Sequence, residues 1–174
     1  MANLNINGSV SIAGPLHGTY SGTYCTDMDS IGSVYDSGWL DIPESPWLNK
    51  NNPRGFGINY SKFRVINNIV FINIFNNQSV TIPVWRETQS ITPAYFGVIP
   101  TVLRPTCYYR WLADPLDSTG YEISVTLDKD NGTLAAVCLG GSKAKNVMSL
   151  CVSYPTDGYE GIDRIDQGLK SMYN

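Results

Sequence analysis

Aromatic, basic and acidic side chains that could recognise a sugar occur together at Tyr109, Arg110, Trp111 and Asp114. Aromatic rings lie flat against the apolar faces of sugar rings, while arginine donates hydrogen bonds to sugar hydroxyls and a carboxylate accepts them. The stretch joins ring, donor and acceptor within one strand end and loop, and binding aromatics often stand on loops over a rigid scaffold. We expect these four residues to bind a saccharide.

Further aromatic and arginine side chains near predicted loops could extend such a site. They are Trp47, Trp85 and Tyr108, with Arg54 and Arg86. In a β-sandwich, however, most tryptophan and tyrosine side chains anchor the core or a subunit interface. For any single aromatic residue of either group, Tyr109 and Trp111 included, the core or interface role is the stronger expectation.

The carboxylates and the histidine give little support for an enzyme. His17 is the only histidine, and no G-x-S-x-G elbow accompanies it. A glycosidase needs two carboxyl groups about 5–9.5 Å apart. The candidate pairs are Asp27 with Asp29, Asp41 with Glu44, and Asp114 with Asp117. Turns and loops explain all of these acids, so we predict no catalytic site.

Metal-binding patterns are also weak. Residues 128–132, Asp-Lys-Asp-Asn-Gly, are similar to a calcium loop, but the glycine comes one place early and Leu139 replaces the bidentate glutamate. The cysteines are widely spaced and form no C-x-x-C pair, which argues against zinc. They are Cys25, Cys107, Cys138 and Cys151. We predict no metal and no cofactor, four reduced thiols, and Cys138 and Cys151 buried in apolar strands.

Length and composition indicate one all-β domain. The 174 residues are enough to bury about 70% of the unfolded surface. The chain is 43% hydrophobic and 16% charged, with 16 glycines and 10 prolines, which is typical of strands joined by many turns. The net charge of −3, without a basic stripe, argues against a nucleic-acid partner. The apolar runs are too short for membrane insertion, and the first residues lack signal-peptide features, so we expect synthesis in a cytoplasm.

A tight hairpin within residues 57–74 forms the predicted centre of the domain. Val70, Ile72 and Ile74 share one face of its second strand because strand side chains alternate. Asn67-Asn68 suits the turn, since asparagine tolerates the left-handed backbone that a two-residue hairpin needs. A polar stretch then separates this strand from a short one over 80–85.

Further strands are predicted on both sides of this hairpin. The strand that precedes it covers residues 34–42, with Trp39 facing inward or toward a subunit contact. An aromatic strand covers 107–112, before a loop that starts at Asp114. The last hairpin turns at Asp130-Asn131-Gly132, where the turn signal is strongest. The final strand has an apolar face, with Met148, Leu150, Val152 and Tyr154.

Both ends of the chain carry apolar stripes. Residues 4–12 alternate as a strand does, and a segment rich in glycine and polar residues follows over 17–33. Near the other end, Ile162, Ile165, Leu169 and Met172 recur at helical spacing and predict a short amphipathic helix. We expect both stripes to pack against neighbouring subunits in a symmetric oligomer.

Four features follow one another in the sequence. They are the opener Ser37-Gly38-Trp39, the strand pair from Tyr60 to Ile74, the segment from Ile99-Pro100 to Arg104-Pro105, and the final hairpin at residues 130–132. This order, over roughly residues 36–154, resembles the C-terminal head domains of tail fibres and receptor-binding proteins from phages of Gram-positive bacteria. The family usually has Gly-Tyr or Gly-Phe where this chain has Val102-Leu103. This departure indicates a distant member of the family.

The resemblance implies an antiparallel β-sandwich or jelly-roll head over residues 34–156. An N-terminal strand and neck would precede it over 1–33, and a tail or short helix would follow over 157–174. It further implies a homotrimer at the phage tail tip, in contact with other tail and baseplate proteins, that attaches the virion to host cell-surface polysaccharide. Three alternatives stay open: a structural baseplate or fibre-tip protein, a carbohydrate-active enzyme, and a bacterial lectin-like module. A flat apolar surface would favour the first, and two facing carboxyl groups the second.

Overall fold

The computed structural model describes residues 35–47, 56–86, 90–115, 121–141, 143–156 and 162–173, all within the unit Tyr35–Asn174. Several sequence predictions fall outside these residues. They are the strand at 4–12, the segment at 17–33 and the candidate residues His17, Cys25, Asp27, Asp29, Arg54 and Asp117. No helix in the described ranges is long and apolar enough to cross a membrane.

Eight antiparallel strands make up most of the described fold. They are β1 (Leu40–Asp41), β2 (Tyr60–Ile66), β3 (Ile69–Ile82), β4 (Ala94–Val98), β5 (Tyr109–Pro115), β6 (Glu122–Leu127), β7 (Thr133–Leu139) and β8 (Lys145–Pro155). A 3-10 turn, Thr101–Leu103, follows β4, and helix α1, Ile162–Tyr173, follows β8. The strands form one sheet in the order β1-β2-β3-β8-β5-β6-β7-β4.

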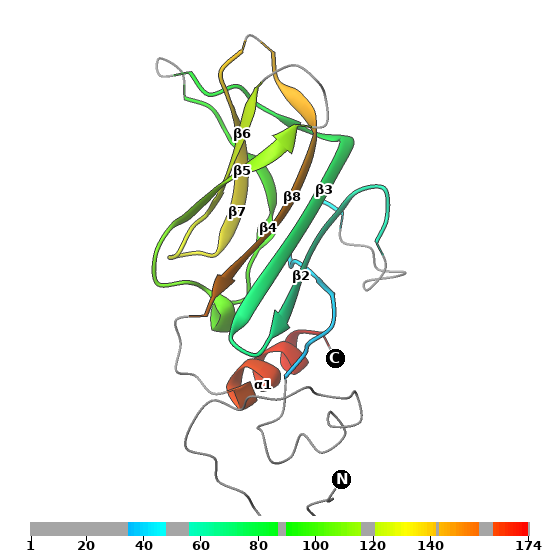
Figure 1. The fold of residues 1–174 in the computed structure, drawn as a ribbon, viewed down its shortest axis with the longest axis vertical. Helices are drawn as coiled ribbons and strands as arrows, with labels where there is room; N and C mark the ends of the chain where they lie inside the picture. Colours follow the sequence, from blue (N-terminus) through cyan, green and yellow to red (C-terminus); the bar gives the residue numbers. More distant parts are fainter. Residues whose placement is uncertain are drawn as a thin grey trace, which may run out of the picture. The chain divides into compact units, whose positions relative to one another are not determined.

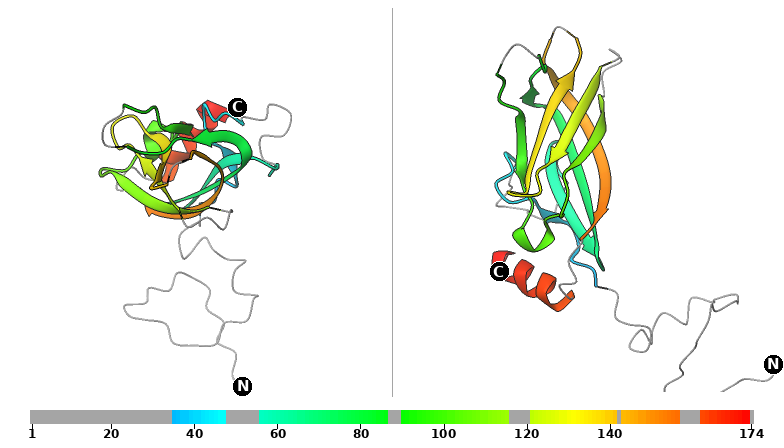
Figure 2. Two further views of the ribbon diagram at one scale, coloured as in Figure 1. Left: turned by 90° about the horizontal axis from the view of Figure 1, so that it is seen from above. Right: turned by 90° about the vertical axis from the view of Figure 1, so that its left-hand side faces the viewer.

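The sheet curls until its two edges meet (Figure 1, Figure 2). β5 joins the halves, because it pairs with β6 through residues 109–113 and with β8 through Asp114 and Pro115. At the edges, the Val98 N–H donates to the Pro43 carbonyl oxygen at 2.9 Å, and the Ser61 hydroxyl donates to the Phe96 carbonyl oxygen at 2.7 Å. The predicted all-β, antiparallel fold with a short C-terminal helix is confirmed. Its two facing halves belong to one continuous sheet.

Both predicted hairpins are present. Asn67 turns between β2 and β3 with a φ of 51°, and Gly132 turns between β6 and β7 with a φ of 77°. Side chains alternate as expected, so one face of each strand is buried in the core. The fully buried residues of β3 and β6 include Val70, Ile72, Ile74, Ile123, Val125 and Leu127.

β3 is longer than the sequence predicts. It continues through the polar stretch to Ile82, and a bulge near its end absorbs the extra residues. The buried Asn76 amide accepts a hydrogen bond from the Val80 N–H at 3.0 Å and donates to the carbonyl oxygens of Val80 and Asn146, at 2.6 and 3.0 Å. A side chain thus replaces the ladder bonds that a bulge removes, which the residue types alone do not reveal.

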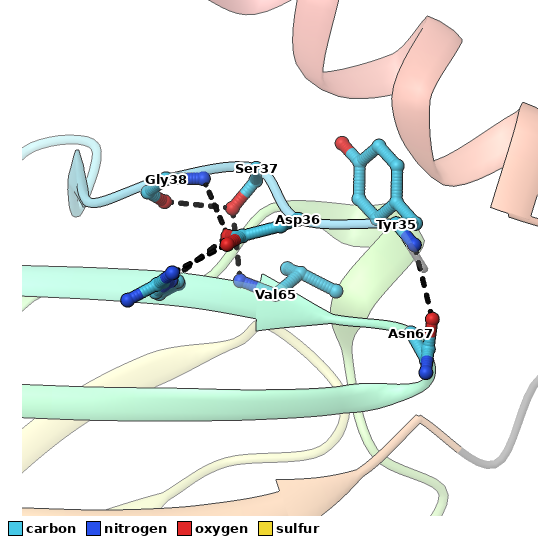
Figure 3. Close-up of polar contacts among 7 residues, drawn as sticks. Tyr35, Asp36, Ser37, Gly38, Val65 and Asn67 are labelled. Atoms are coloured by element: carbon cyan, nitrogen blue, oxygen red, sulfur yellow. Dashed lines mark hydrogen bonds and ion pairs between the residues drawn. The ribbon is translucent and has the colours of Figure 1, made fainter. Parts of the chain in front are cut away.

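Side-chain bonds hold the segment before β1, where the sequence predicts a strand over 34–42. Gly38 has a φ of 65°, which interrupts the extended backbone, and β1 is limited to Leu40–Asp41. The Ser37 hydroxyl accepts a hydrogen bond from the Val65 N–H at 2.9 Å, and Asp36 pairs with Arg64 (Figure 3). The hydrogen bond from the Arg64 guanidinium lowers the pKa of Asp36 to about 2.

Helix α1 packs against one end of the curled sheet (Figure 1). Ile165 and Leu169 are buried in the core of the same chain. The Tyr173 hydroxyl donates to the Asp41 carbonyl oxygen at 2.5 Å, and Gly168 lies so close to Val102 that a Cβ would meet its methyl groups at 3.0 and 3.1 Å. The helix is confirmed, but the expectation that its stripe packs on a neighbouring subunit is wrong for Ile165 and Leu169.

The described cysteines differ from the prediction at one position. Cys107, Cys138 and Cys151 form no disulfide with one another, and Cys138 is buried as expected. Cys151 is exposed, because it alternates along β8 with the buried Leu150 and therefore faces outward.

Candidate functional site

Strand alternation divides the predicted saccharide-binding group between two faces of β5. Tyr109 and Trp111 point toward the core, whereas Arg110 and Asp114 point outward. Asp114 lies within β5, paired with Ser149 of β8, and not in the predicted loop. The four side chains therefore do not converge on one surface.

The two inward rings belong to the packing of the core. Tyr109 and Trp111 stack with their ring centroids 5.4 Å apart and their planes 10° apart. Both lie against Tyr154, at centroid distances of 5.4 and 6.3 Å. The Tyr154 hydroxyl donates to the Leu103 carbonyl oxygen at 2.8 Å, and burial raises the pKa of this phenol well above its usual range. This cluster anchors the 3-10 turn to the sheet.

The outward face of the same strands is hollowed. A pocket of about 320 Å³ opens there, lined by Trp85, Arg110, Ser124, Thr126, Val137 and Leu139. β5 supplies the arginine, β6 the two hydroxyl residues and β7 the two aliphatic residues. The pocket thus spans three neighbouring strands, with an aromatic ring at its side. We take it as the candidate functional site and call it the Trp85 pocket.

Backbone pairing across the sheet edge places the tryptophan. The Cys138 N–H donates to the Pro83 carbonyl oxygen at 2.8 Å, and the Trp85 N–H donates to the Cys138 carbonyl oxygen at 2.9 Å. These bonds align the segment after β3 in parallel with β7 at Val84. Trp85 is 52% exposed, so its ring is available to a ligand.

Arg110 is the charged residue in the described lining of the Trp85 pocket. Its Nε donates to the Ser124 hydroxyl at 2.7 Å, which fixes the guanidinium against β6. No carboxylate in the described part of the chain pairs with Arg110. Asp114 and Glu122 lie on the outward side of their strands, but neither lines the pocket.

The sequence prediction contains part of this site. Arg110 was in the predicted group and Trp85 in the wider aromatic set. Ser124 and Thr126 were missed, although the alternation of the last hairpin already places them on its polar face. The pairing of Arg110 with Thr126, and of Leu112 with Ser124, then brings these hydroxyls beside the arginine.

Other predicted aromatic residues have structural partners. The Trp47 ring lies 5.4 Å from that of Phe96, and its Nε1 donates to the Ser79 hydroxyl at 2.9 Å. Tyr108 is exposed, and its hydroxyl donates to the Asp130 carboxylate at 2.7 Å at the β6–β7 turn. It lies outside the Trp85 pocket and offers a matched control for it.

Asp41 and Glu44, one of the candidate catalytic pairs, are engaged separately. Asp41 is buried and its Oδ1 lies 2.5 Å from the Lys62 Nζ. Glu44 is exposed and accepts a hydrogen bond from the Tyr95 hydroxyl at 2.8 Å. Partial burial and this carboxylate raise the pKa of Tyr95 to about 12. The two acids therefore do not share a cleft as a glycosidase pair would.

The loop that is similar to a calcium site is explained by its turn. Asp128 Oδ1 accepts a hydrogen bond from the Asp130 N–H at 2.8 Å, and Asn131 Oδ1 accepts one from the Thr133 N–H at 2.8 Å. Within the described ranges, no three histidine, cysteine or acidic side chains gather as metal ligands would.

Two further hollows adjoin α1. One, of about 320 Å³, lies between residues 98–104 and the helix, and the other, of about 230 Å³, lies between residues 35–40 and the helix. The described lining of the larger hollow contains no aromatic residue, and Tyr35 and Tyr173, which line the smaller one, are half-buried. The described residues of neither hollow therefore present an open ring as the Trp85 pocket does.

Comparison with protein-family models and with curated protein sequences found no match to this chain. The candidate site therefore rests on the geometry of the described residues.

Proposed function

We propose that this chain is the head of a phage receptor-binding protein, and that it adheres to host cell-surface saccharide through the Trp85 pocket. One observation carries the proposal: a half-exposed Trp85 ring stands beside Arg110 and two hydroxyl groups in an open hollow on the outward face of the sheet. The viral role rests on the resemblance in the order of sequence features.

The chemistry of the pocket suits a sugar. The apolar face of a pyranose can stack on Trp85, while its hydroxyl groups exchange hydrogen bonds with Thr126 and with the Arg110 guanidinium. Val137 and Leu139 supply an apolar floor. Sites for small molecules generally combine such an apolar lining with a few placed polar groups.

Binding to purified Gram-positive cell walls and to a glycan array tests the proposal. Replacing the half-exposed ring in Trp85→Ala should weaken binding by about 10-fold or more, as truncating an aromatic anchor does, with little change in stability. Tyr108→Ala removes another exposed ring outside the pocket and should leave binding unchanged. Equal loss in both variants, or no loss in Trp85→Ala, would overturn the assignment of this pocket.

The same proposal includes a homotrimer. Light scattering on a size-exclusion column should give a mass near three times 19.2 kDa. A monomer would contradict the trimeric head and leave a single-chain binding module. Exposed apolar side chains that could meet a neighbouring subunit include Phe56, Ile58, Leu112 and Met172.

A structural fibre-tip protein is the second candidate, favoured by one observation. Phe56 and Ile58, two residues apart in the sequence, are 48% and 77% exposed, and a contiguous apolar patch at a surface marks a contact with another protein. This alternative predicts no cell-wall binding and retention of the chain by other tail proteins. Wall binding that depends on Trp85 would contradict it.

A further inference from the structure

Among the described residues that line the Trp85 pocket, Arg110 alone is charged. The other lining side chains are an indole, two hydroxyls and two aliphatic groups. A guanidinium beside these neutral groups makes the pocket locally cationic, although the whole chain has a net charge of −3. Salt screens charges beyond about 8–10 Å, and the nearer acid Glu122, which pairs with Leu139 across the sheet, does not itself line the pocket.

The Arg110 guanidinium is oriented and still able to bind. Its Nε is occupied by the Ser124 hydroxyl at 2.7 Å, whereas its Nη1 and Nη2 have no acceptor among the described residues. By contrast, Lys62 and Arg64 each form an ion pair with an aspartate. An arginine that is fixed at one nitrogen and open at two presents the fork that binds carboxylate or phosphate oxygens in pairs.

We infer that the Trp85 pocket selects a saccharide bearing an anionic substituent, a carboxylate or a phosphate, which Arg110 binds through Nη1 and Nη2 while the sugar ring stacks on Trp85. This inference rests on the proposed saccharide-binding function and adds the class of sugar. A neutral saccharide would leave the guanidinium with hydroxyl partners only, which are weaker acceptors than a carboxylate or phosphate oxygen.

Matched glycans test this selection. The probes are oligosaccharides printed in pairs that share a backbone, one neutral and the other bearing a uronate or a phosphate. The wild-type protein should favour the anionic member of a pair by about 10-fold or more, since hydrogen bonds to charged groups are the stronger ones. Arg110→Gln should remove this preference, and Arg110→Lys should keep part of it, because lysine retains the charge and loses the fork.

Arg86→Gln is the matched control. Arg86 follows Trp85 directly and is exposed, but it does not line the pocket. Arg86→Gln removes the same charge as Arg110→Gln. Because Arg86 lies outside the pocket, Arg86→Gln should preserve the preference for the anionic glycan. If Arg86→Gln and Arg110→Gln reduce the preference equally, general attraction of anions accounts for it and the inference fails.

A second measurement follows the guanidinium itself. In a 1H–15N NMR titration, the Arg110 Nε–H signal, identified by its loss in Arg110→Lys, should shift with glucuronate and with inorganic phosphate but not with glucose. No shift with either anion overturns the inference. The inference is also overturned if the wild-type protein binds both members of each array pair with equal strength. If that binding is lost in Trp85→Ala, the saccharide-binding proposal still stands. Absence of any glycan binding contradicts the proposed function. The titration then shows only whether Arg110 binds an anion.

Discussion

Replacing Lys62 with methionine should destabilise this protein strongly, because Lys62 forms a buried ion pair. Its side chain is 1% exposed, that of Asp41 is 4% exposed, and the Nζ and Oδ1 atoms are 2.5 Å apart. Asp41 Oδ2 has no hydrogen-bond partner among the described residues. Lys62→Met therefore leaves a buried carboxylate without its cation, a change that generally costs about 3–5 kcal/mol. In a domain of this size the melting temperature should fall by roughly 6–20 °C.

Arg64→Met is the control on the same strand. Arg64 lies two residues further along β2 and pairs with Asp36, but the two side chains are 34% and 37% exposed. The loss of stability in Arg64→Met should be far smaller than in Lys62→Met, since water and salt screen an exposed pair. Urea unfolding of both variants would measure the difference in the free energy of unfolding, provided that its slope against urea concentration is unchanged. A Lys62→Met variant as stable as Arg64→Met would refute the argument from burial.

The pH dependence of Lys62→Met gives a second test of the same pair. Burial raises the pKa of Asp41, and the Lys62 ammonium opposes this rise. Without the ammonium, the folded state holds a proton on Asp41 more tightly than the unfolded state does. The stability that protonated Asp41 contributes to the variant is therefore retained below the unfolded pKa of 3.8. It is lost as the pH rises through the pKa of Asp41 in the folded state. The deficit of the variant should be smaller at about pH 4 than at about pH 7, and Asp41→Asn in the Lys62→Met background should restore part of it.

Three further predictions concern stability. Trp111→Ala should lower the free energy of unfolding by about 2–4 kcal/mol because its ring stacks in the core, whereas Trp85→Ala should change it little; thermal melts compare the two. Asp36, whose pKa falls from 3.8 to about 2, contributes stability that is present above pH 3.8 and lost toward pH 2, so urea midpoints of Asp36→Asn and wild type should converge in acid. Gly97→Ala should cost more than Gly140→Ala in melting temperature, since both have positive φ but only at Gly97 would a Cβ lie 2.7 Å from a carbonyl oxygen.

Local patterns predicted the parts of the fold that depend on local chemistry. The turns at Asn67 and Gly132 follow from residues that accept positive φ, and the buried faces of β3 and β6 follow from strict alternation. The bulge in β3 did not follow, because Asn76 binds not only the nearby Val80 but also the backbone of Asn146, a residue distant in the sequence. The secondary-structure propensities of single residues do not predict such a contact.

The candidate site was predicted only in part for the same reason. Adjacent residues in a strand face opposite ways, so Arg110 and Trp111 could not serve one ligand once β5 formed. The position of Trp85 depends on two backbone bonds to Cys138 on β7, and that of Arg110 on Ser124 of β6. The ion pair of Lys62 was also hidden, since a lysine at a strand position normally predicts a solvated face.

Hydroxyl-radical footprinting with mass spectrometry tests the central claim most directly. The protein is oxidised with and without purified Gram-positive cell-wall polysaccharide, and the oxidation of each aromatic residue is measured. The proposed site predicts that polysaccharide protects Trp85, while Tyr108, which is exposed outside the pocket, stays reactive. Bound polysaccharide that leaves Trp85 as reactive as in the unbound protein would contradict the assignment of this pocket as the receptor-binding site.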